Sequence, residues 1–261
     1  MTTLALIGKG RWGSKYLEVV KHIKDCQIKY VKTRDYKDLL KAKDIDGIII
    51  ATPVDTHAEI IKAFPDKYLL VEKPLTTSYN DAYKITNKKI MIGHTYLYDN
   101  AYQKFRNKVK AMQPKVKYFS FEIINPESYG SKSTPLWELA PHMIAMVIDL
   151  FGGISEVDTY TVGKEQNAYA LIRCKKVEGC VSFGWISNTR VRNFKVTNTE
   201  VDIQLDTSLT KNPTALENEL QAFIDFIKTG KTRSGLGFGK EVVKVLEAIE
   251  DSMKQEKKIT L

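Results

Sequence analysis

The chain has 261 residues, of which 43% are apolar and 27% are charged, and its formal net charge is +9. This length allows two modest domains, and the composition is that of a globular protein rather than a disordered one. No apolar run approaches the roughly 20 residues that cross a bilayer. The first residues lack the features of a signal peptide, so we expect neither a membrane protein nor an exported one.

The positive charge comes from lysines spread along the whole chain, with no basic block interleaved with aromatic residues. Nucleic acid is therefore not an expected partner, whereas an anionic small molecule is. Three cysteines, Cys26, Cys174 and Cys180, have no metal-ligand spacing. We expect no metal site and interpret them as small core residues of a protein in the reducing cytoplasm.

The first 95 residues alternate short apolar runs with helical stretches. Strands are expected at Thr3–Ile7, Gln27–Lys32, Gly47–Ala51, Tyr68–Val71 and Ile90–Ile92. Apolar residues at helical spacing predict helices at Trp12–Ile23, Tyr36–Ala42, Thr56–Phe64 and Tyr79–Thr86. Nearly uninterrupted apolar strands that alternate with helices are typical of a parallel sheet covered on both faces. The pattern predicts a Rossmann domain with a doubly wound parallel sheet over residues 1–95.

A glycine-rich turn follows the first expected strand. Gly8 permits the tight turn, Gly10 leaves no Cβ in the way of a pyrophosphate, and Gly13 lets the next helix pack closely on the strand. That helix directs free N–H groups toward the anion. An ordinary strand–turn–helix is the alternative. The turn predicted to bind the dinucleotide comprises Gly8, Lys9, Gly10, Arg11, Trp12 and Gly13.

The residues at the end of the second expected strand indicate whether the cofactor is NAD or NADP. An acidic residue is expected there in folds that prefer NAD, because it binds the ribose hydroxyls. The chain instead has Lys32, Thr33 and Arg34, which offer two charges and a hydroxyl for a 2′-phosphate. A solvated charge run is the alternative. We predict NADP as the preferred cofactor, with NAD as the second possibility.

The third and fourth expected strands end in motifs that point to the cofactor site. Ala51, Thr52 and Pro53 form a turn at the sheet edge where nucleotides bind, and His57 follows, either as a cofactor contact or as a structural histidine. Glu72 and Lys73 precede a proline that makes the next turn rigid. A desolvated lysine at this edge can exchange a proton with a substrate oxygen, although a lysine that ends a strand is often simply solvated.

After Gly93 the pattern of elements changes. A helix is expected at Ala101–Met112, a strand at Val116–Ile124 and a helix at Leu136–Leu150. Consecutive strands then follow at Val157–Val162, Ala168–Cys174, Cys180–Ile186, Phe194–Asn198 and Val201–Leu205, and helices at Ala215–Lys228 and Lys240–Lys254 end the series. Strands without intervening helices favour an antiparallel sheet. We predict an α+β domain over residues 96–261, with a large, mainly antiparallel, open-faced sheet for binding substrate and for oligomerisation.

One helix in this half carries an acid–base pair. Glu138 and His142 are four residues apart and therefore share one helical face, where a carboxylate can fix the tautomer of an imidazole and raise its basicity. Pro141 suggests that the helix begins near Leu139 or Ala140. A helix-capping acid beside a chance histidine is the alternative.

The order of these motifs resembles the glucose–fructose oxidoreductase, inositol dehydrogenase and rhizopine-catabolism (Gfo/Idh/MocA) superfamily over essentially the whole chain. Ser182, Trp185, Arg190 and Arg192 resemble a strand of its branch associated with surface sugars. The resemblance implies hydride transfer between a nicotinamide and a secondary alcohol or ketone of a sugar or nucleotide-sugar. It also implies that Lys73 lies between nicotinamide and substrate and that His142 is the principal acid–base residue. Glu138 stands where the family usually has Asp.

Further residues are expected around the substrate, or else in the packing behind it: His94, Tyr96, Asn125, Tyr129 and Trp137. Lys132, Arg190, Arg192 and Lys195 favour an anionic substrate. A homodimer or homotetramer is expected, because a large apolar sheet face is seldom left to solvent. Two other functions remain open: a dinucleotide-sensing protein without turnover, and a reductase of an imine or a pigment double bond.

Overall fold

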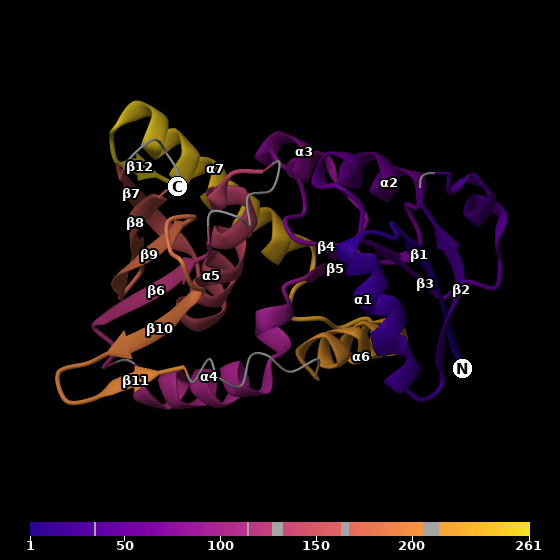
Figure 1. Cartoon of the computed structure of the whole chain (residues 1–261), viewed down its shortest axis with the longest axis horizontal. Coiled ribbons are helices and arrows are strands. Elements are labelled where there is room, and N and C mark those ends of the chain that lie inside the picture. The colour runs from indigo at the N-terminus through magenta and orange to yellow at the C-terminus, as the bar shows by residue number, and fades with distance from the viewer. Residues whose placement is uncertain (34, 114, 127–132, 163–166, 206–213) are drawn as a thin grey trace. The chain divides into compact units, whose positions relative to one another are not determined.

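The computed structural model describes residues 1–33, 35–113, 115–126, 133–162, 167–205 and 214–261 (Figure 1). The chain divides into two compact units. The first contains Met1–Tyr98 and Pro213–Val243, and the second contains Asp99–Asn212 and Lys244–Leu261. Each unit has its own sheet. Among the described residues, no helix is both long and apolar enough to cross a membrane.

The first unit is built on a five-stranded parallel sheet. Its strands are β1 (Thr2–Ile7), β2 (Cys26–Lys32), β3 (Gly47–Ile50), β4 (Tyr68–Glu72) and β5 (Ile90–Gly93), in the order β2-β1-β3-β4-β5. The central strands are almost completely buried, whereas the edge strand β2 alternates between half-buried and exposed residues. This confirms the predicted doubly wound parallel sheet.

The helices between these strands are short. They are α1 (Arg11–Val19), α2 (His57–Ala63) and α3 (Tyr79–Lys84), together with 3₁₀ helices at Val20–His22, Lys37–Lys41, Val54–Thr56 and Thr95–Tyr98. The expected helix at Tyr36–Ala42 is thus a single 3₁₀ segment. Serine at position 78 caps α3, because its side chain accepts a hydrogen bond from the backbone N–H of Asp81.

The chain returns to this sheet after the second unit. Helix α6 (Thr214–Thr229) places Phe223 and Ile227 against β3, where a Cβ added to Gly47 would lie 2.9 Å and 2.8 Å from them. Ile92 of β5 donates its backbone N–H to the carbonyl oxygen of Ser234 at 2.7 Å. The sequence-based division at residue 95 assigned this returning segment to the second domain, and the structure differs because the apolar face of α6 completes the core of the first unit.

The second unit contains a seven-stranded sheet in the order β11-β10-β6-β9-β8-β7-β12. The strands are β6 (Tyr118–Ile124), β7 (Ile154–Val162), β8 (Asn167–Cys174), β9 (Glu178–Gly184), β10 (Val191–Thr197), β11 (Asp202–Gln204) and β12 (Ile259–Thr260). All neighbouring pairs are antiparallel except β6 and β9, which run parallel with Phe121 opposite Val181. The mainly antiparallel sheet is confirmed, and the one parallel pair was not expected from consecutive strands.

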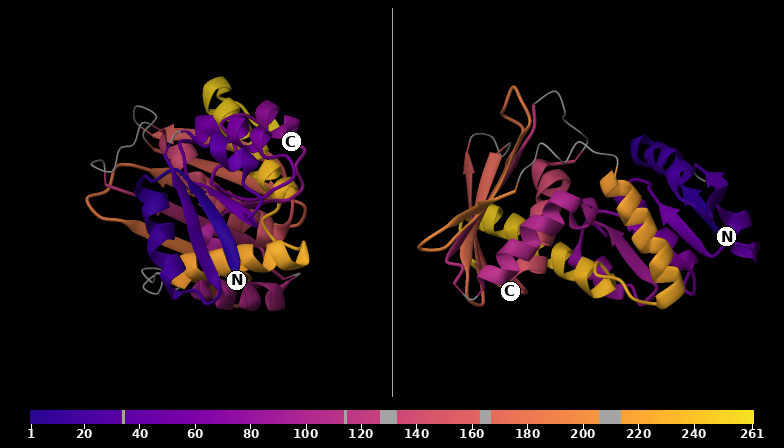
Figure 2. Two further views of the ribbon diagram at one scale, coloured as in Figure 1. Left: turned by 90° about the vertical axis from the view of Figure 1, so that its right-hand side faces the viewer. Right: turned by 90° about the horizontal axis from the view of Figure 1, so that it is seen from below.

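Helices cover one face of this sheet (Figure 2). They are α4 (Asn100–Met112), α5 (Pro135–Phe151) and the later part of α7 (Leu236–Gln255), a helix that begins within the first unit. Phe119, Phe121 and Ile123 of β6 are buried on the covered face. Several large side chains on the other face are exposed: Tyr118, Tyr160, Val162, Tyr169 and Leu171.

Candidate functional site

The glycine turn after β1 has no room for a side chain at Gly8 and Gly13, but it has room for one at Gly10. Gly8 has a φ of +99°, and a Cβ added there would lie 2.4 Å from the carbonyl oxygen of Ala51. A Cβ on Gly13 would lie 1.8 Å from the carbonyl oxygen of Gly8, so only glycine allows α1 to pack this closely. An added Cβ on Gly10 would meet no described atom within 4 Å. The free space beside this glycine is what a bound pyrophosphate needs.

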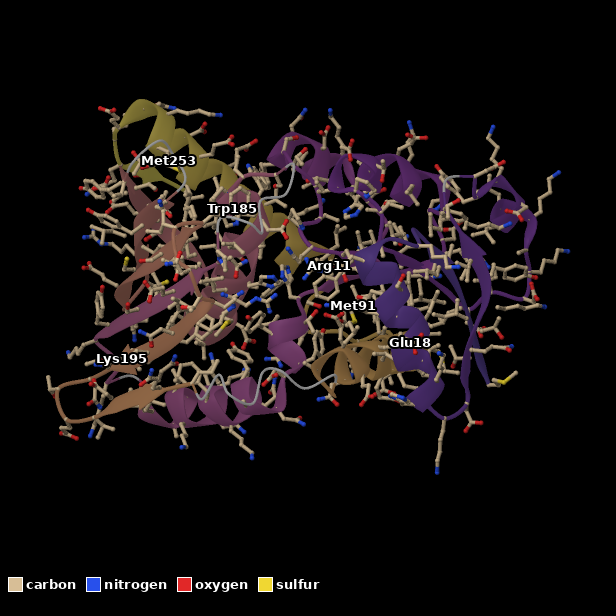
Figure 3. All side chains as sticks on the ribbon, in the orientation of Figure 1. Arg11, Glu18, Met91, Trp185, Lys195 and Met253 are labelled. Carbon is tan, nitrogen blue, oxygen red and sulfur yellow. The ribbon has the colours of Figure 1, made fainter. Side chains whose placement is uncertain are left out.

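Helix α1 begins at this open side. No side chain caps its N-terminus at Gly10, and Arg11 is its first residue (Figure 3). Its first backbone N–H groups therefore remain available to an anion. Lys9 and Arg11 are exposed beside the turn, and the Lys15 ammonium lies 3.9 Å above the Trp12 ring centroid. The glycine turn thus combines free space at Gly10 with an uncapped helix N-terminus and two exposed cations.

The end of β2 contains an ion pair that the sequence did not predict. The ammonium of Lys32 contacts the carboxylate of Asp38, in the 3₁₀ helix that follows. Thr33 is exposed, and Arg34 lies outside the described residues. Lys32 therefore stands at the position expected for recognition of the ribose, with its charge shared with an acidic neighbour.

The turn after β3 is tied to the turn after β4 through His57. Its ring nitrogen Nε2 lies 3.1 Å from the carbonyl oxygen of Thr52, and Nδ1 lies 3.1 Å from that of Pro74. The side chain is 1% exposed, and burial lowers its pKa from the ordinary value. The Thr56 hydroxyl contacts the Thr52 hydroxyl at 2.7 Å. These contacts favour the structural alternative for His57, which holds the Ala51-Thr52-Pro53 turn in place.

Strand β4 ends in a buried carboxylate followed by a half-buried lysine. Glu72 accepts a hydrogen bond from the Tyr16 hydroxyl at 2.9 Å, and Lys73 follows at the end of the strand. Burial raises the pKa of Glu72, while the positive charge of Lys73 acts in the opposite direction. Glu72 is therefore a buried carboxylate that interacts electrostatically with Lys73 and has little contact with solvent.

Two residues beside Glu72 were missed by sequence reasoning. Tyr16 lies on α1, and its hydroxyl is also 2.9 Å from a carboxylate oxygen of Glu219 on α6. Glu219 is fully buried. One signal was present in the sequence, because this acid lies among the apolar residues Leu216, Leu220 and Phe223 on the buried face of a helix.

His94 follows β5 and is buried beside Lys73. Its side chain is 1% exposed, and neither ring nitrogen has a hydrogen-bond partner among the described residues. Burial first, and then the charge of Lys73, lower the pKa of His94 to about 3. Tyr96, in the next turn, is half-buried. His94 is therefore a buried neutral imidazole with no hydrogen-bond partner for either ring nitrogen among the described residues.

The expected acid–base pair lies near the start of α5. The helix begins at Pro135, not near Leu139, so Glu138 is in its first turn and Pro141 is inside it. The prediction of the start was wrong because the helix accommodates Pro141, whose missing N–H removes only one backbone hydrogen bond. Glu138 and His142 are both half-buried on one helix, four residues apart.

The other expected substrate contacts in the second unit are partly engaged with neighbours. Trp137 donates its indole N–H to a carboxylate oxygen of Glu250 at 3.1 Å. Arg192 donates to the side-chain oxygen of Asn125 at 2.8 Å and to two backbone carbonyl oxygens. Lys195 pairs with Asp202 at 2.5 Å. Tyr129 and Lys132 lie outside the described residues.

No group of three histidine, cysteine or acidic side chains that could bind a metal ion is found in the described part of the chain.

Residues 23–90 match the family described as the oxidoreductase family with an NAD-binding Rossmann fold. The chain is 28% identical over 200 residues to 4-carboxy-2-hydroxymuconate-6-semialdehyde dehydrogenase of Sphingobium sp., a match that covers 64% of this chain and 61% of that enzyme. It is 38% identical over 69 residues to dTDP-3,4-didehydro-2,6-dideoxy-alpha-D-glucose 3-reductase of Saccharopolyspora spinosa, covering 24% and 21%. The matched regions thus span about three fifths or less of these two relatives.

The fold is shared over the whole chain with solved structures. Myo-inositol dehydrogenase from Lactobacillus casei, in complex with NAD(H) and myo-inositol, superposes with a TM-score of 0.89 at 16% identity and covers 100% of this chain and 97% of its own. With the glycine turn, the Glu72-Lys73-Pro74 segment at the end of β4 and the two-unit fold, these matches make the chain similar to oxidoreductases of the Gfo/Idh/MocA family.

Proposed function

We propose that the protein is an NAD(P)-dependent oxidoreductase that acts on a secondary alcohol, or the corresponding ketone, of a sugar or nucleotide-sugar. The observation that carries this proposal is the opening at Gly10, which is bounded by the uncapped start of α1 and by two glycines that tolerate no Cβ. The backbone of this turn would hold the pyrophosphate of a dinucleotide. When bound, the nicotinamide supplies or accepts the hydride.

The chain's own residues would handle the proton of the substrate oxygen. Lys73 directly follows β4 at the carboxyl edge of the sheet, where it would polarise that oxygen and hold the substrate near the nicotinamide. His142, oriented by Glu138, is proposed as the principal acid–base group. Either Lys73 or His142 would take the hydroxyl proton in the oxidation direction and return it in the reduction direction.

NADP is the proposed preferred cofactor. Lys32 is the last residue of β2, Thr33 and Arg34 come next in the sequence, and none of these three positions is acidic. A 2′-phosphate could recruit Lys32 from its ion pair with Asp38, since phosphate offers a higher charge than one carboxylate. NAD remains the alternative, because the Lactobacillus casei structure contains NAD(H).

An anionic substrate is proposed from the cations of the second unit. Arg192 is held by Asn125 and two carbonyl oxygens, an arrangement that orders a guanidinium for recognition of a carboxylate or phosphate. With such a substrate, kcat/KM should fall with added salt, because the Debye length shortens from about 10 Å at 0.1 M to about 3 Å at 1 M. Neutral sugars that turn over as fast as their nucleotide forms would exclude an anionic substrate.

The proposed assembly is a homodimer or homotetramer joined through the exposed face of the second sheet, and the proposed setting is the cytoplasm. Stacked Tyr160 and Tyr169, with ring centroids 5.3 Å apart, are exposed on this face and support the first proposal. The second is supported by Cys26, Cys174 and Cys180, none of which forms a disulfide within the described residues.

The test has two stages on the full chain. Binding of NADPH and NADH is first titrated by fluorescence. Sugars, inositols and nucleotide-sugars are then screened for turnover by the absorbance of the reduced nicotinamide. Turnover of at least one sugar class is expected. Cofactor binding without turnover of any of them would favour the dinucleotide-sensing alternative, and absence of cofactor binding would contradict both.

A further inference from the structure

Three buried side chains from distant parts of the chain meet in the first unit. The Tyr16 hydroxyl oxygen lies 2.9 Å from Oε1 of Glu72 and 2.9 Å from Oε1 of Glu219. Tyr16 and Glu219 are fully buried and Glu72 nearly so. The three residues come from α1, β4 and α6. Two carboxyl groups therefore share one phenolic oxygen in the core, next to Lys73.

The number of protons in this cluster follows from its geometry. Both contacts have hydrogen-bond length, and each hydrogen bond needs one proton between its two oxygens. The Tyr16 hydroxyl has a single proton, and its own pKa is raised well above the usual value, mainly by burial. If both carboxyl groups were ionised, one contact would bring two oxygens together without a proton, and two buried negative charges would face each other. One carboxyl group must supply the second proton.

The charged neighbours of Glu72 and Glu219 determine which of the two carboxyl groups carries the second proton. Glu72 is followed directly by Lys73, and both Lys73 and Lys15 favour its ionised form. No cation is among the causes that act on Glu219, whose pKa is raised well above the usual value by burial and by the charge of Glu72. The proton therefore belongs on Glu219.

The other charged and polar neighbours do not reverse this assignment. The Thr95 hydroxyl lies beside Glu219 and lowers its pKa, against the larger effects of burial and of Glu72. Tyr98 also lies near Glu219, and its hydroxyl is hydrogen-bonded to that of Ser234 at 2.9 Å. His94 is next to Lys73 and is neutral, as its pKa of about 3 requires. The groups that face the cluster are Lys15 on α1, Lys73 after β4, His94 after β5, and Thr95 and Tyr98 in the following 3₁₀ helix.

We propose that Glu219 is a neutral carboxylic acid that donates to Tyr16, that Tyr16 donates to Glu72, and that this chain of hydrogen bonds fixes the single negative charge on the carboxylate beside Lys73. Tyr16 and Glu219 are then positioning residues that act on Lys73 through Glu72. The catalytic role of Lys73 is the one part of this inference that depends on the proposed function. The protonation pattern is a property of the folded chain alone.

The first experiment locates the proton by infrared spectroscopy of the full chain without cofactor or substrate. At neutral pH the wild type should show the carbonyl stretch of a protonated carboxylic acid, which shifts in D₂O. The Glu219→Gln variant should lack this band, and the Glu72→Gln variant should keep it. A band that disappears in Glu72→Gln but remains in Glu219→Gln, or no such band in the wild type, would overturn the proposal.

The second experiment measures how the cluster acts on Lys73. Competitive acetylation at a series of pH values, read by mass spectrometry of the peptide that contains Lys73, gives the pH at which this amine is half-reactive. Glu72→Gln removes the counter-charge and should lower that pH by about one to three units. Tyr16→Phe removes the donor to Glu72 and should lower it by a smaller amount.

Two variants complete this design. Glu219→Gln keeps a neutral donor, so the half-reaction pH of Lys73 should stay at the wild-type value. A decrease in that variant would mean that Glu219 is ionised, which contradicts the proposal. Tyr98→Phe removes another buried hydroxyl of the same unit and should also leave Lys73 unchanged. An unchanged Tyr16→Phe profile would reject the positioning role of Tyr16. Neither experiment depends on turnover, so the proposed oxidoreductase activity could fail while this inference stands.

Discussion

The imidazole of His94 packs edge-on against the ring of Phe238, with ring centroids 5.6 Å apart and ring planes at 69°. This apolar contact, together with complete burial, makes protonation of His94 costly, and its pKa is lowered to about 3. The unfolded chain binds a proton at this histidine near pH 6.5, whereas the folded chain does not. The stability that neutral His94 contributes is therefore complete above about pH 6.5 and is lost as the pH falls toward about 3.

This difference predicts a weaker acid sensitivity for His94→Phe. The free energy of unfolding of the wild type should fall relative to that of the variant by about 1.4 kcal/mol for each pH unit below about 6.5. Urea unfolding at a series of pH values measures both curves. Parallel curves for wild type and His94→Phe would show that His94 is protonated in the folded protein.

A pair of glycine substitutions separates cofactor binding from folding. Gly10→Ala adds a methyl group where no described atom lies within 4 Å, at a φ of −80° that alanine adopts readily. It should fold with the wild-type melting temperature but bind NADPH at least about tenfold more weakly, a loss of about 1.4 kcal/mol. Gly13→Ala forces a Cβ to within 1.8 Å of the Gly8 carbonyl oxygen and should destabilise the fold by about 1–3 kcal/mol or more.

The control for this pair is Gly237→Ala, at another glycine whose added Cβ would have no neighbour within 4 Å. This variant should have nearly the wild-type melting temperature and the wild-type affinity for the cofactor. Wild-type binding of NADPH by Gly10→Ala would place the pyrophosphate elsewhere.

Removal of the Lys73 amine should impair turnover rather than folding. Lys73→Ala is expected to lower kcat by about 10²–10⁴-fold, the usual contribution of a general acid or base. The matched control is Lys62→Ala, at an exposed lysine of α2. The measurement is the absorbance of the reduced nicotinamide with the substrate found in the screen. Near-normal turnover in Lys73→Ala would leave His142 as the proton-transfer group.

The end of β2 should determine cofactor preference. NADPH is expected to bind more tightly than NADH, and Arg34→Ala or Lys32→Ala should reduce that ratio of dissociation constants. Lys29→Ala removes a lysine of the same strand that is paired with Asp44, and it should leave the ratio unchanged. A wild-type preference for NADH would mean that Lys32 and its neighbours serve only as a solvated charge run.

The exposed face of the second sheet should carry the subunit contact. Leu171 is 43% exposed there, and Leu171→Lys is expected to shift the mass in light scattering toward the monomer, because a buried unpaired ammonium is costly. Leu40→Lys, at an exposed leucine of the first unit, is the control and should retain the wild-type mass. A wild type that is monomeric at micromolar concentration would reject this interface.

The parallel sheet of the first unit was predictable because its signals are local. Gly47–Ile50 is a continuous apolar run, and the glycines that follow β1 define the turn and the start of α1. The return of α6 was not predictable, because its packing on β3 joins residues far apart in the chain. The parallel pairing of β6 with β9 likewise depends on a long connection through α5, which strand patterns alone do not encode.

The candidate site divides in the same way. Lys73 follows from a strand end, and His142 from a helical spacing. The hydrogen bond between Tyr16 and Glu219 spans 203 positions of the sequence, so neither residue could be linked to Lys73 before the fold was known. The roles of Thr52 and His57 also depend on backbone carbonyl groups, which no side-chain pattern reveals.

The first unit is built from two separate parts of the sequence, so it cannot complete its core until late in translation. Residues 1–98 emerge first, but the sheet they form lacks the aromatic cover of Phe223 until α6 has been synthesised, after the whole of residues 99–212. Meanwhile the apolar surface around Gly47 stays open to other nascent chains and to chaperones. A chain truncated after residue 98 would keep this apolar surface exposed. Residues 1–98 are therefore expected to be insoluble unless residues 213–243 are joined to them.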